Sequence, residues 1–240
     1  RPKKASDVII EKESYLNKDT AIIIQGNLDG LKNFVKETIE IYLKLFQSST
    51  IILSTWDTDI NEKFLNDYKD KINNIINKKP KNIFHSTDLQ TISTQAAVKL
   101  AKGLDLKFCL KSRTDCRIYK KNTVTYLKNL LNLFPINSNY ENLKSRIISC
   151  SVDTRKYRVY GFSDIMLFGS TENIGKYFSN ESFEEGIKKH NFGDYPSTIN
   201  ETAVVHEIFL CARFLKDSNI TINWTLEDWW NKCRDIFCVV

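Results

Sequence analysis

Near its start the chain carries the run Ala21-Ile22-Ile23-Ile24-Gln25-Gly26-Asn27. The apolar part of this run is uninterrupted and rich in β-branched residues, which is typical of a strand covered on both faces of a sheet. A second run of this kind, residues 50–54, leads into Thr55-Trp56-Asp57. Between the two runs, apolar residues recur at helical spacing from Leu31 to Phe46. The order strand, helix, strand predicts a βαβ unit and a parallel sheet.

The same alternation continues along the chain. Apolar spacing and Pro or Gly terminators predict helices at 64–79, 89–103 and 122–133, with strands at 82–84 and 106–111. The second half predicts shorter strands at 147–151, 158–162 and 165–168, and helices at 201–215 and 226–237. We therefore expect an α/β fold: a Rossmann-like, mostly parallel mixed sheet flanked by helices. Residues 1–19 form an N-terminal extension in this interpretation, and residues 20–240 form one domain.

Composition and charge exclude several classes of protein. The 240 residues carry 35 Lys and Arg against 29 Asp and Glu, and these charges are dispersed along the chain. This is unlike a dedicated nucleic-acid binder, so we expect no nucleic-acid partner. The chain contains neither GxGxxG nor GxxxxGK[ST], which argues against dinucleotide oxidoreductases and P-loop NTPases. It begins with Arg1 rather than Met, and we expect it to be part of a larger multidomain chain.

The cysteines and tryptophans predict packing and compartment. The six cysteines form no CxxC pair, and Cys109 and Cys211 stand in apolar runs, so we expect both to be buried. Free thiols indicate a reducing cytoplasm, with the inner face of a membrane as an alternative location. Trp229 and Trp230 are expected to pack against the sheet, with contact to a membrane surface or an acceptor sugar as the alternative.

A binding site is expected where the parallel strands end. Ligands of open α/β sheets bind beyond the carboxyl ends of the strands. The first two strands end at Gln25-Gly26 and at Trp56-Asp57. Gly26 would let the backbone approach a ligand, Trp56 could stack on a base, and Asp57 could accept from a ribose or a base. Gly26 as a turn residue and Trp56 as core packing remain open alternatives.

The strand predicted at 106–111 ends in a charged loop. Asp115 stands here among Lys111, Arg113 and Arg117. Its carboxylate could hold a divalent metal while the cations balance a diphosphate. The alternative is that Asp115 is simply an ion-paired loop residue.

Five blocks of the chain, taken in order, resemble a known family. The first two are the strand runs that end at Gly26 and Trp56. The third is Leu110-Lys111-Ser112-Arg113-Thr114-Asp115, the fourth is the segment 162–169 with its Ser-Asp and Phe-Gly pairs, and the fifth is Glu201 at the head of a helix. In this order the blocks resemble the WavE-type lipopolysaccharide-synthesis proteins over about residues 20–238.

This resemblance implies a GT-A-like glycosyltransferase. Such an enzyme takes a nucleotide-diphosphate sugar as donor, often with Mn²⁺ or Mg²⁺, and builds cell-surface polysaccharide such as lipopolysaccharide or capsule. Asp115 falls where these enzymes place an Asp-x-Asp metal motif, but Arg113 replaces the first Asp. Arginines could instead neutralise the leaving diphosphate. For the base that sugar transfer needs, the candidates are Asp164 and Glu201.

Two further points stay open at this stage. His206 follows Glu201 by five residues, and we expect it to pack within a helix, with metal ligation as the alternative. The acceptor is a glycan or a lipid-linked glycan. The alternative function is a catalytically degenerate GT-A-like module that binds a glycan or a partner domain.

Overall fold

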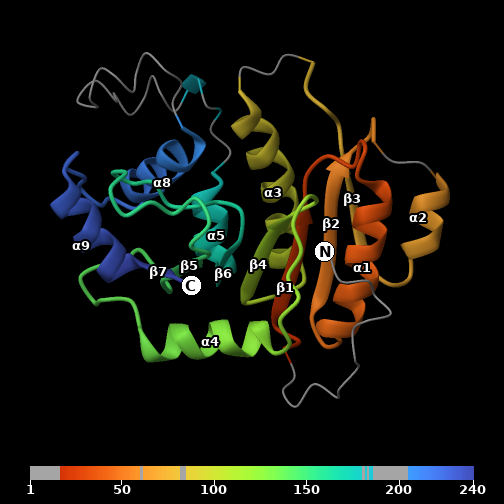
Figure 1. Ribbon diagram of the computed structural model, residues 1–240, viewed down its shortest axis with the longest axis horizontal. Helices are drawn as coiled ribbons and strands as arrows, with labels where there is room; N and C mark the ends of the chain where they lie inside the picture. Colours follow the sequence, from red (N-terminus) through yellow and green to blue (C-terminus); the bar gives the residue numbers. More distant parts are fainter. Residues whose placement is uncertain (1–16, 60–61, 82–84, 180–181, 183, 186–204) are drawn as a thin grey trace.

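The computed structural model describes residues 17–59, 62–81, 85–179, 182, 184–185 and 205–240 (Figure 1). Strands β1 (Thr20–Gln25), β2 (Thr50–Trp56), β3 (Asn73–Asn77) and β4 (Phe108–Arg113) form its parallel half. Strands β5 (Ile147–Ser149), β6 (Leu167–Ser170) and β7 (Phe237–Val239) complete a seven-stranded sheet of order β3-β2-β1-β4-β6-β5-β7. This is the mixed, mostly parallel α/β sheet that the sequence predicts.

One strand runs against its neighbours. β6 is antiparallel to both β4 and β5, and it pairs Leu167 with Lys111 near the end of β4. The residues just before β6 therefore reach the same edge of the sheet as the residues that follow β1, β2 and β4.

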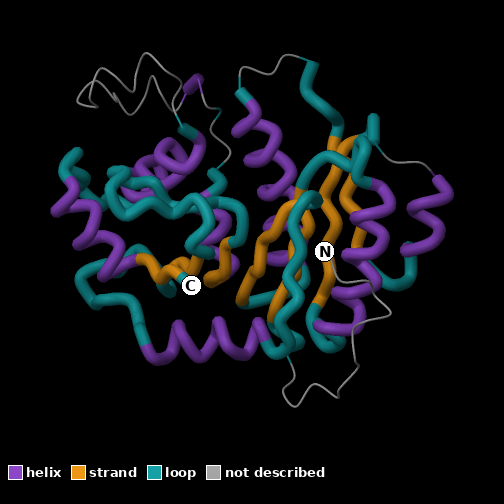
Figure 2. Tube along the Cα trace, viewed as in Figure 1, coloured by secondary structure: helices purple, strands orange, loops and turns teal. Residues whose placement is uncertain are grey.

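Helices cover both faces of the sheet (Figure 2). One apolar layer joins the β1 residues Ile22 and Ile24 to α1 (Lys32–Leu45), α2 (Glu62–Tyr68) and α4 (Thr123–Leu133). The other layer joins Ala21 and Ile23 to α3 (Ser86–Gly103), α5 (Thr171–Tyr177), α8 (His206–Asp217) and α9 (Leu226–Ile236). Alternate residues of β1 thus enter opposite layers, as the continuous apolar run requires.

The structure corrects several predicted elements. The helix predicted at 64–79 is two elements, α2 and β3. α2 ends at Tyr68, whose carbonyl accepts from the amides of Lys71 and Ile72 in a turn that leads into β3. The strand predicted at 158–162 is a series of turns, with Tyr160 at a φ of 54°. The strand predicted at 165–168 is shifted to 167–170, and α8 begins at His206. The strand predicted at 82–84 and residue Glu201 lie outside the described residues.

The predictions that Cys109, Cys211 and Trp229 are buried are confirmed, and the prediction that Trp230 packs against the sheet is wrong. Cys109 and Cys211 are fully buried, and none of the six cysteines forms a disulfide. Trp229 is 1% exposed in the core, whereas Trp230 on the next position of α9 is 41% exposed. Among the helices of the described ranges, none combines the length and the apolar character needed to cross a membrane.

Candidate functional site

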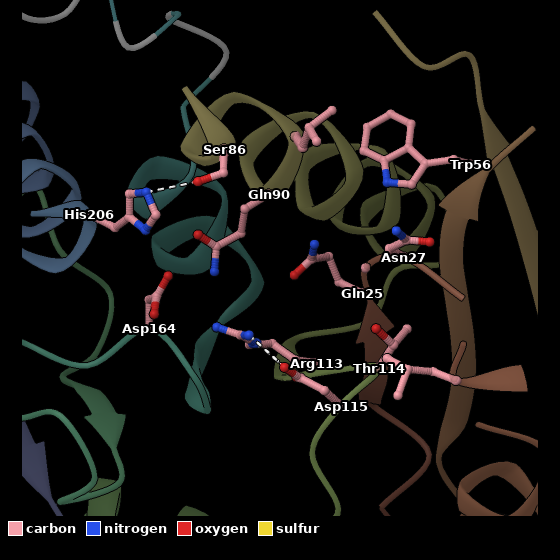
Figure 3. Close-up of a pocket in the computed structure, with 13 residues that line it drawn as sticks. Gln25, Asn27, Trp56, Ser86, Gln90, Arg113, Thr114, Asp115, Asp164 and His206 are labelled. Atoms are coloured by element: carbon pink, nitrogen blue, oxygen red, sulfur yellow. Dashed lines mark hydrogen bonds and ion pairs between the residues drawn. The ribbon is translucent and has the colours of Figure 1, made fainter. Parts of the chain in front are cut away.

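A pocket of about 290 Å³ lies at the carboxyl edge of the parallel strands (Figure 3). Six of the residues predicted for the site line it: Gln25, Gly26, Trp56, Arg113, Asp115 and Asp164. They come from the ends of β1, β2 and β4 and from the loop before β6. The edge predicted from strand order is therefore where a pocket forms.

The end of β1 forms the floor of the pocket. Gly26 has a φ of 137°, and a Cβ built on it would lie 2.6 Å from Oγ1 of Thr114. Its amide donates to the Ser54 carbonyl, and the Thr114 amide donates to the Gln25 carbonyl, so three strand ends are tied together. Gln25 is 6% exposed and its Oε1 has no hydrogen-bond partner within the described part. An acceptor atom is thus present at the pocket without a protein donor.

The end of β2 separates the two residues predicted there. Trp56 lines the pocket, although it is only 1% exposed, so most of its ring serves the core. Asp57 does not line the pocket; it is exposed, and its Oδ1 accepts from the Lys79 amide at 3.2 Å. Trp56 contributes a wall at this end, and Asp57 holds the β2 loop against the segment after β3.

A two-bond ion pair stands at the end of β4. The Arg113 guanidinium donates to Asp115 through Nε at 2.9 Å and through a terminal nitrogen at 2.6 Å. Burial acts to raise the pKa of Asp115, but the hydrogen bonds and the charge of Arg113 outweigh it and hold this pKa below its ordinary value. Two of the five guanidinium N–H donors are used in this way. The other three make no hydrogen bond to the described residues and can donate to an anionic ligand.

This ion pair bears on the predicted metal. Divalent cations take several oxygen ligands, usually with more than one carboxylate. Both oxygens of Asp115 already accept from Arg113, and no group of three or more His, Cys, Asp or Glu residues able to hold a metal occurs among the residues that the structure describes. The described residues do not fit a bound Mn²⁺ or Mg²⁺.

The other two predicted cations lie outside the pocket lining. Lys111 is fully buried beneath it, and its Nζ donates to the Asp164 carbonyl at 2.5 Å. Burial lowers the pKa of Lys111 to about 8, against the opposing charge of Asp164. Arg117 turns to α1, where it donates to Oγ1 of Thr38 at 2.7 Å and stacks over the Phe34 ring. Arg113 is therefore the predicted cation that the structure brings to the pocket.

The opposite end of the pocket contains Asp164, His206, Ser86 and Gln90 (Figure 3). Asp164 is 3% exposed and was predicted; Glu201, the other predicted carboxylate, lies outside the described residues. His206 was expected to pack within a helix, but it lines the pocket from the first residue of α8. Ser86 and Gln90, from the start of α3, were not predicted. Recognising β3 as a strand would have found them, because the segment after it leads to the same edge.

Comparisons with known proteins give limited matches. No protein-family model matches the chain, and no curated protein matches it. Among solved structures, an active-site mutant of LgtC is similar with a TM-score of 0.41 and 13% identity, covering 92% of this chain and 72% of that one. Core-mannan synthase A from Aspergillus fumigatus, in its Mn/GDP form, has a TM-score of 0.34 and 11% identity, covering 74% of this chain and 69% of that one. A functional proposal for this chain therefore depends on the pocket itself.

Proposed function

We propose that the protein is a glycosyltransferase that moves a sugar from a nucleotide-diphosphate sugar to a glycan acceptor. The observation that carries this proposal is the position of Arg113 between two different ends of one pocket (Figure 3). The end near Gln25 and Trp56 is aromatic and neutral, and the end near Asp164 carries an acid. The three parts of a nucleotide-sugar donor match this order: the nucleobase needs a neutral, aromatic region, the diphosphate needs a cation, and the reacting sugar needs a nearby acid or base.

The donor would lie along the carboxyl edge of the sheet. Gly26 lines the pocket at the end of β1, where the lack of a side chain makes room for Thr114. The Oε1 of Gln25, which has no partner among the described residues, can accept from a nucleobase or a ribose. Arg113 would bind the diphosphate through charge-assisted hydrogen bonds, which are stronger than neutral ones. In the transfer step this cation would stabilise the charge that develops on the leaving diphosphate. The buried ammonium of Lys111 would add positive potential from beneath.

The acceptor and its activation belong to the other end. Asp164 lies in the pocket there, and Asp164 and Glu201 are our proposed catalytic carboxylates. From the WavE-type resemblance we propose a cell-surface polysaccharide as product, lipopolysaccharide or capsule, with a glycan or lipid-linked acceptor. The free thiols are in keeping with a reducing cytoplasm as the compartment.

One observation favours the alternative function. Arg113 stands where the resemblance places the first Asp of the metal motif, and it donates to both carboxylate oxygens of the second Asp, Asp115. A chain that has lost the metal motif in this way could bind a glycan without transferring a sugar. Substitution Asp115→Ala separates the two functions. A transferase should lose turnover, because Asp115 orients the Arg113 guanidinium, whereas a binding module should keep its glycan affinity.

The first test is thermal unfolding with UDP-, GDP-, CMP- and dTDP-sugars, each with and without Mn²⁺. A ligand present at about 100 times its Kd stabilises the folded state by about 2.7 kcal/mol. We expect one nucleotide to stabilise the protein without Mn²⁺. Arg113→Gln should weaken its binding by about 10- to 100-fold, the value of hydrogen bonds to a charged group. Arg155→Gln is the control, since that side chain is 58% exposed and lines no part of the pocket.

The contrary outcomes are clear. Stabilisation by no nucleotide contradicts the transferase and favours the binding module. Equal affinity in Arg113→Gln and the unaltered protein contradicts the placement of the diphosphate.

A further inference from the structure

Two helices begin side by side at the acidic end of the pocket. Ser86 is the first residue of α3 and His206 is the first residue of α8, and Oγ of Ser86 lies 3.0 Å from Nε2 of His206. The His85 ring meets the His206 ring edge-on, with centroids 4.3 Å apart. These contacts hold the His206 ring in one orientation at the pocket wall.

Asp164 approaches the same ring from the loop before β6. Figure 3 shows its carboxylate on the same side of the pocket, pointing toward His206, while Ser86 binds the ring from above. When Nε2 accepts from the Ser86 hydroxyl, the ring proton is on Nδ1. The arrangement is an imidazole bound by a hydroxyl and facing a carboxylate within a ligand-sized pocket.

The surroundings keep this imidazole neutral. Burial lowers the pKa of His206, the charge of Asp164 acts to raise it, and the charge of Arg113 acts to lower it. The N-terminus of α8 also disfavours a cation at its first residue. The other titratable groups here, in the part of the chain that the structure describes, are His85, Asp88 and Glu207. A histidine that is neutral near pH 7 is able to receive a proton.

We propose that His206 is the base that takes the proton of the nucleophile, and this rests on the glycosyltransferase function proposed above. The nucleophile's oxygen forms the new bond to the anomeric carbon of the donor sugar as the bond from that carbon to the diphosphate oxygen breaks. The electron pair of the broken bond leaves with the diphosphate, next to Arg113. The nucleophile's proton goes to Nε2 of His206, in place of the bond from Ser86, and Asp164 stabilises the imidazolium. The proton then passes to water.

The proposal makes two predictions of opposite sign. In the tautomer protonated at Nδ1 the Ser86 hydroxyl donates to Nε2 and binds only the neutral form of the ring, so for this tautomer Ser86→Ala should raise the pKa of His206. The Asp164 charge favours the imidazolium, so Asp164→Asn should lower the pKa of His206. If His206 is the base, the rate falls at low pH as His206 becomes protonated. The pH at which this fall occurs, the acidic limb of the pH–rate profile, must then move in the same directions.

The experiment uses the whole chain and the sugar nucleotide found by thermal unfolding, with water or a soluble sugar as nucleophile. Release of nucleoside diphosphate is measured from pH 5 to 9 for the unaltered protein, Ser86→Ala, Asp164→Asn and His206→Gln. The ring protons of the three histidines are titrated by NMR in the same proteins, and His206→Gln identifies the signal. Affinity for the nucleoside diphosphate is measured by calorimetry.

We expect His206→Gln to lose about 10²- to 10⁴-fold in kcat/KM, with its diphosphate affinity unchanged and its acidic limb absent. Added imidazole should restore part of the rate. If His206→Gln does not fold, His206→Asn is measured in its place. The opposite pKa shifts in Ser86→Ala and Asp164→Asn test the proposal without any change to His206.

Three results overturn the proposal. The first is a His206→Gln enzyme with the unaltered rate and acidic limb. The second is an acidic limb that does not follow the NMR pKa in the Ser86 and Asp164 variants. In both cases turnover continues and only the assignment of the base is wrong. The third is no turnover of any sugar nucleotide by the unaltered protein, which contradicts the proposed function as well.

Discussion

Replacing Gly26 by Ala tests how tightly the pocket floor is built. The φ of 137° belongs to a region that residues with a side chain rarely adopt, and occupying such a region costs about 1–3 kcal/mol. The new methyl would also lie 2.6 Å from Oγ1 of Thr114, a residue that is 4% exposed. Overpacking of this kind costs about 1–3 kcal/mol. Together the two effects predict a loss of at least about 2 kcal/mol in the free energy of unfolding.

The assay is urea and thermal unfolding of matched variants. For a chain of this size the loss in Gly26→Ala corresponds to a fall in Tm of about 4–8 °C. The control is Gly103→Ala at the end of α3, where no atom lies within 4 Å of the new Cβ. That change should be neutral or stabilise by up to about 1 kcal/mol. In a Thr114→Ala background, Gly26→Ala should cost less, and the difference measures the steric part.

Two results would refute this reasoning. One is a Gly26→Ala protein whose stability lies within about 0.5 kcal/mol of the original, the usual range of harmless surface changes. The other is an equal effect of Gly26→Ala and Gly103→Ala, which would mean that neither the backbone angle nor Thr114 matters.

Two further predictions concern burial. Trp229→Ala should lower the free energy of unfolding by about 3–5 kcal/mol, the range for large aromatic residues in a core. Trp230→Ala, at a 41% exposed position, should lower it far less. Urea unfolding compares the two variants, and equal losses would contradict the packing of α9. For Lys111 the folded pKa of about 8 lies below the ordinary 10.5, so the unfolded chain binds more protons between these values and stability rises with pH. The unaltered protein should therefore gain up to about 3 kcal/mol relative to Lys111→Met between pH 7 and pH 10.5; a constant difference in urea unfolding would show that Lys111 is not desolvated.

The parallel core of the sheet could be predicted because its strands are buried on both faces. β1 and β2 contain uninterrupted apolar runs, β4 begins with three apolar residues, and each strand ends in a distinct polar turn. β3 was missed for the opposite reason. It lies at the edge of the sheet and is half exposed, and Phe64, Tyr68, Ile72 and Ile76 happen to follow helical spacing across two elements.

The position of the site could be predicted from the ends of the strands, but the side chains that point into it could not. Gln25, Trp56 and Arg113 follow from the rule that ligands bind beyond the carboxyl ends of strands. Nothing in the residue type distinguishes Arg113, at the pocket, from Arg117, which lies against Phe34. His206 is the first residue of an apolar helix, and its contact with Ser86 spans 120 positions of the chain. Such pairings depend on how the two apolar layers are assembled.

The reversal of β6 also has a consequence for how this fold can change. Since β6 runs against β4, the connection that enters it, residues 150–166, is the one that reaches the pocket, whereas its junction with α5 lies at the opposite edge. Loops accept insertions and substitutions at far lower cost than the strands they join. Lengthening or diversifying this connection would remodel the acceptor end while β1, β2 and the donor end stay as they are. A library built on the exposed residues 151–153 and 155–157 of this connection, with the buried Tyr160, Phe162 and Ser163 kept, is therefore a route to new acceptor preferences that keeps the donor.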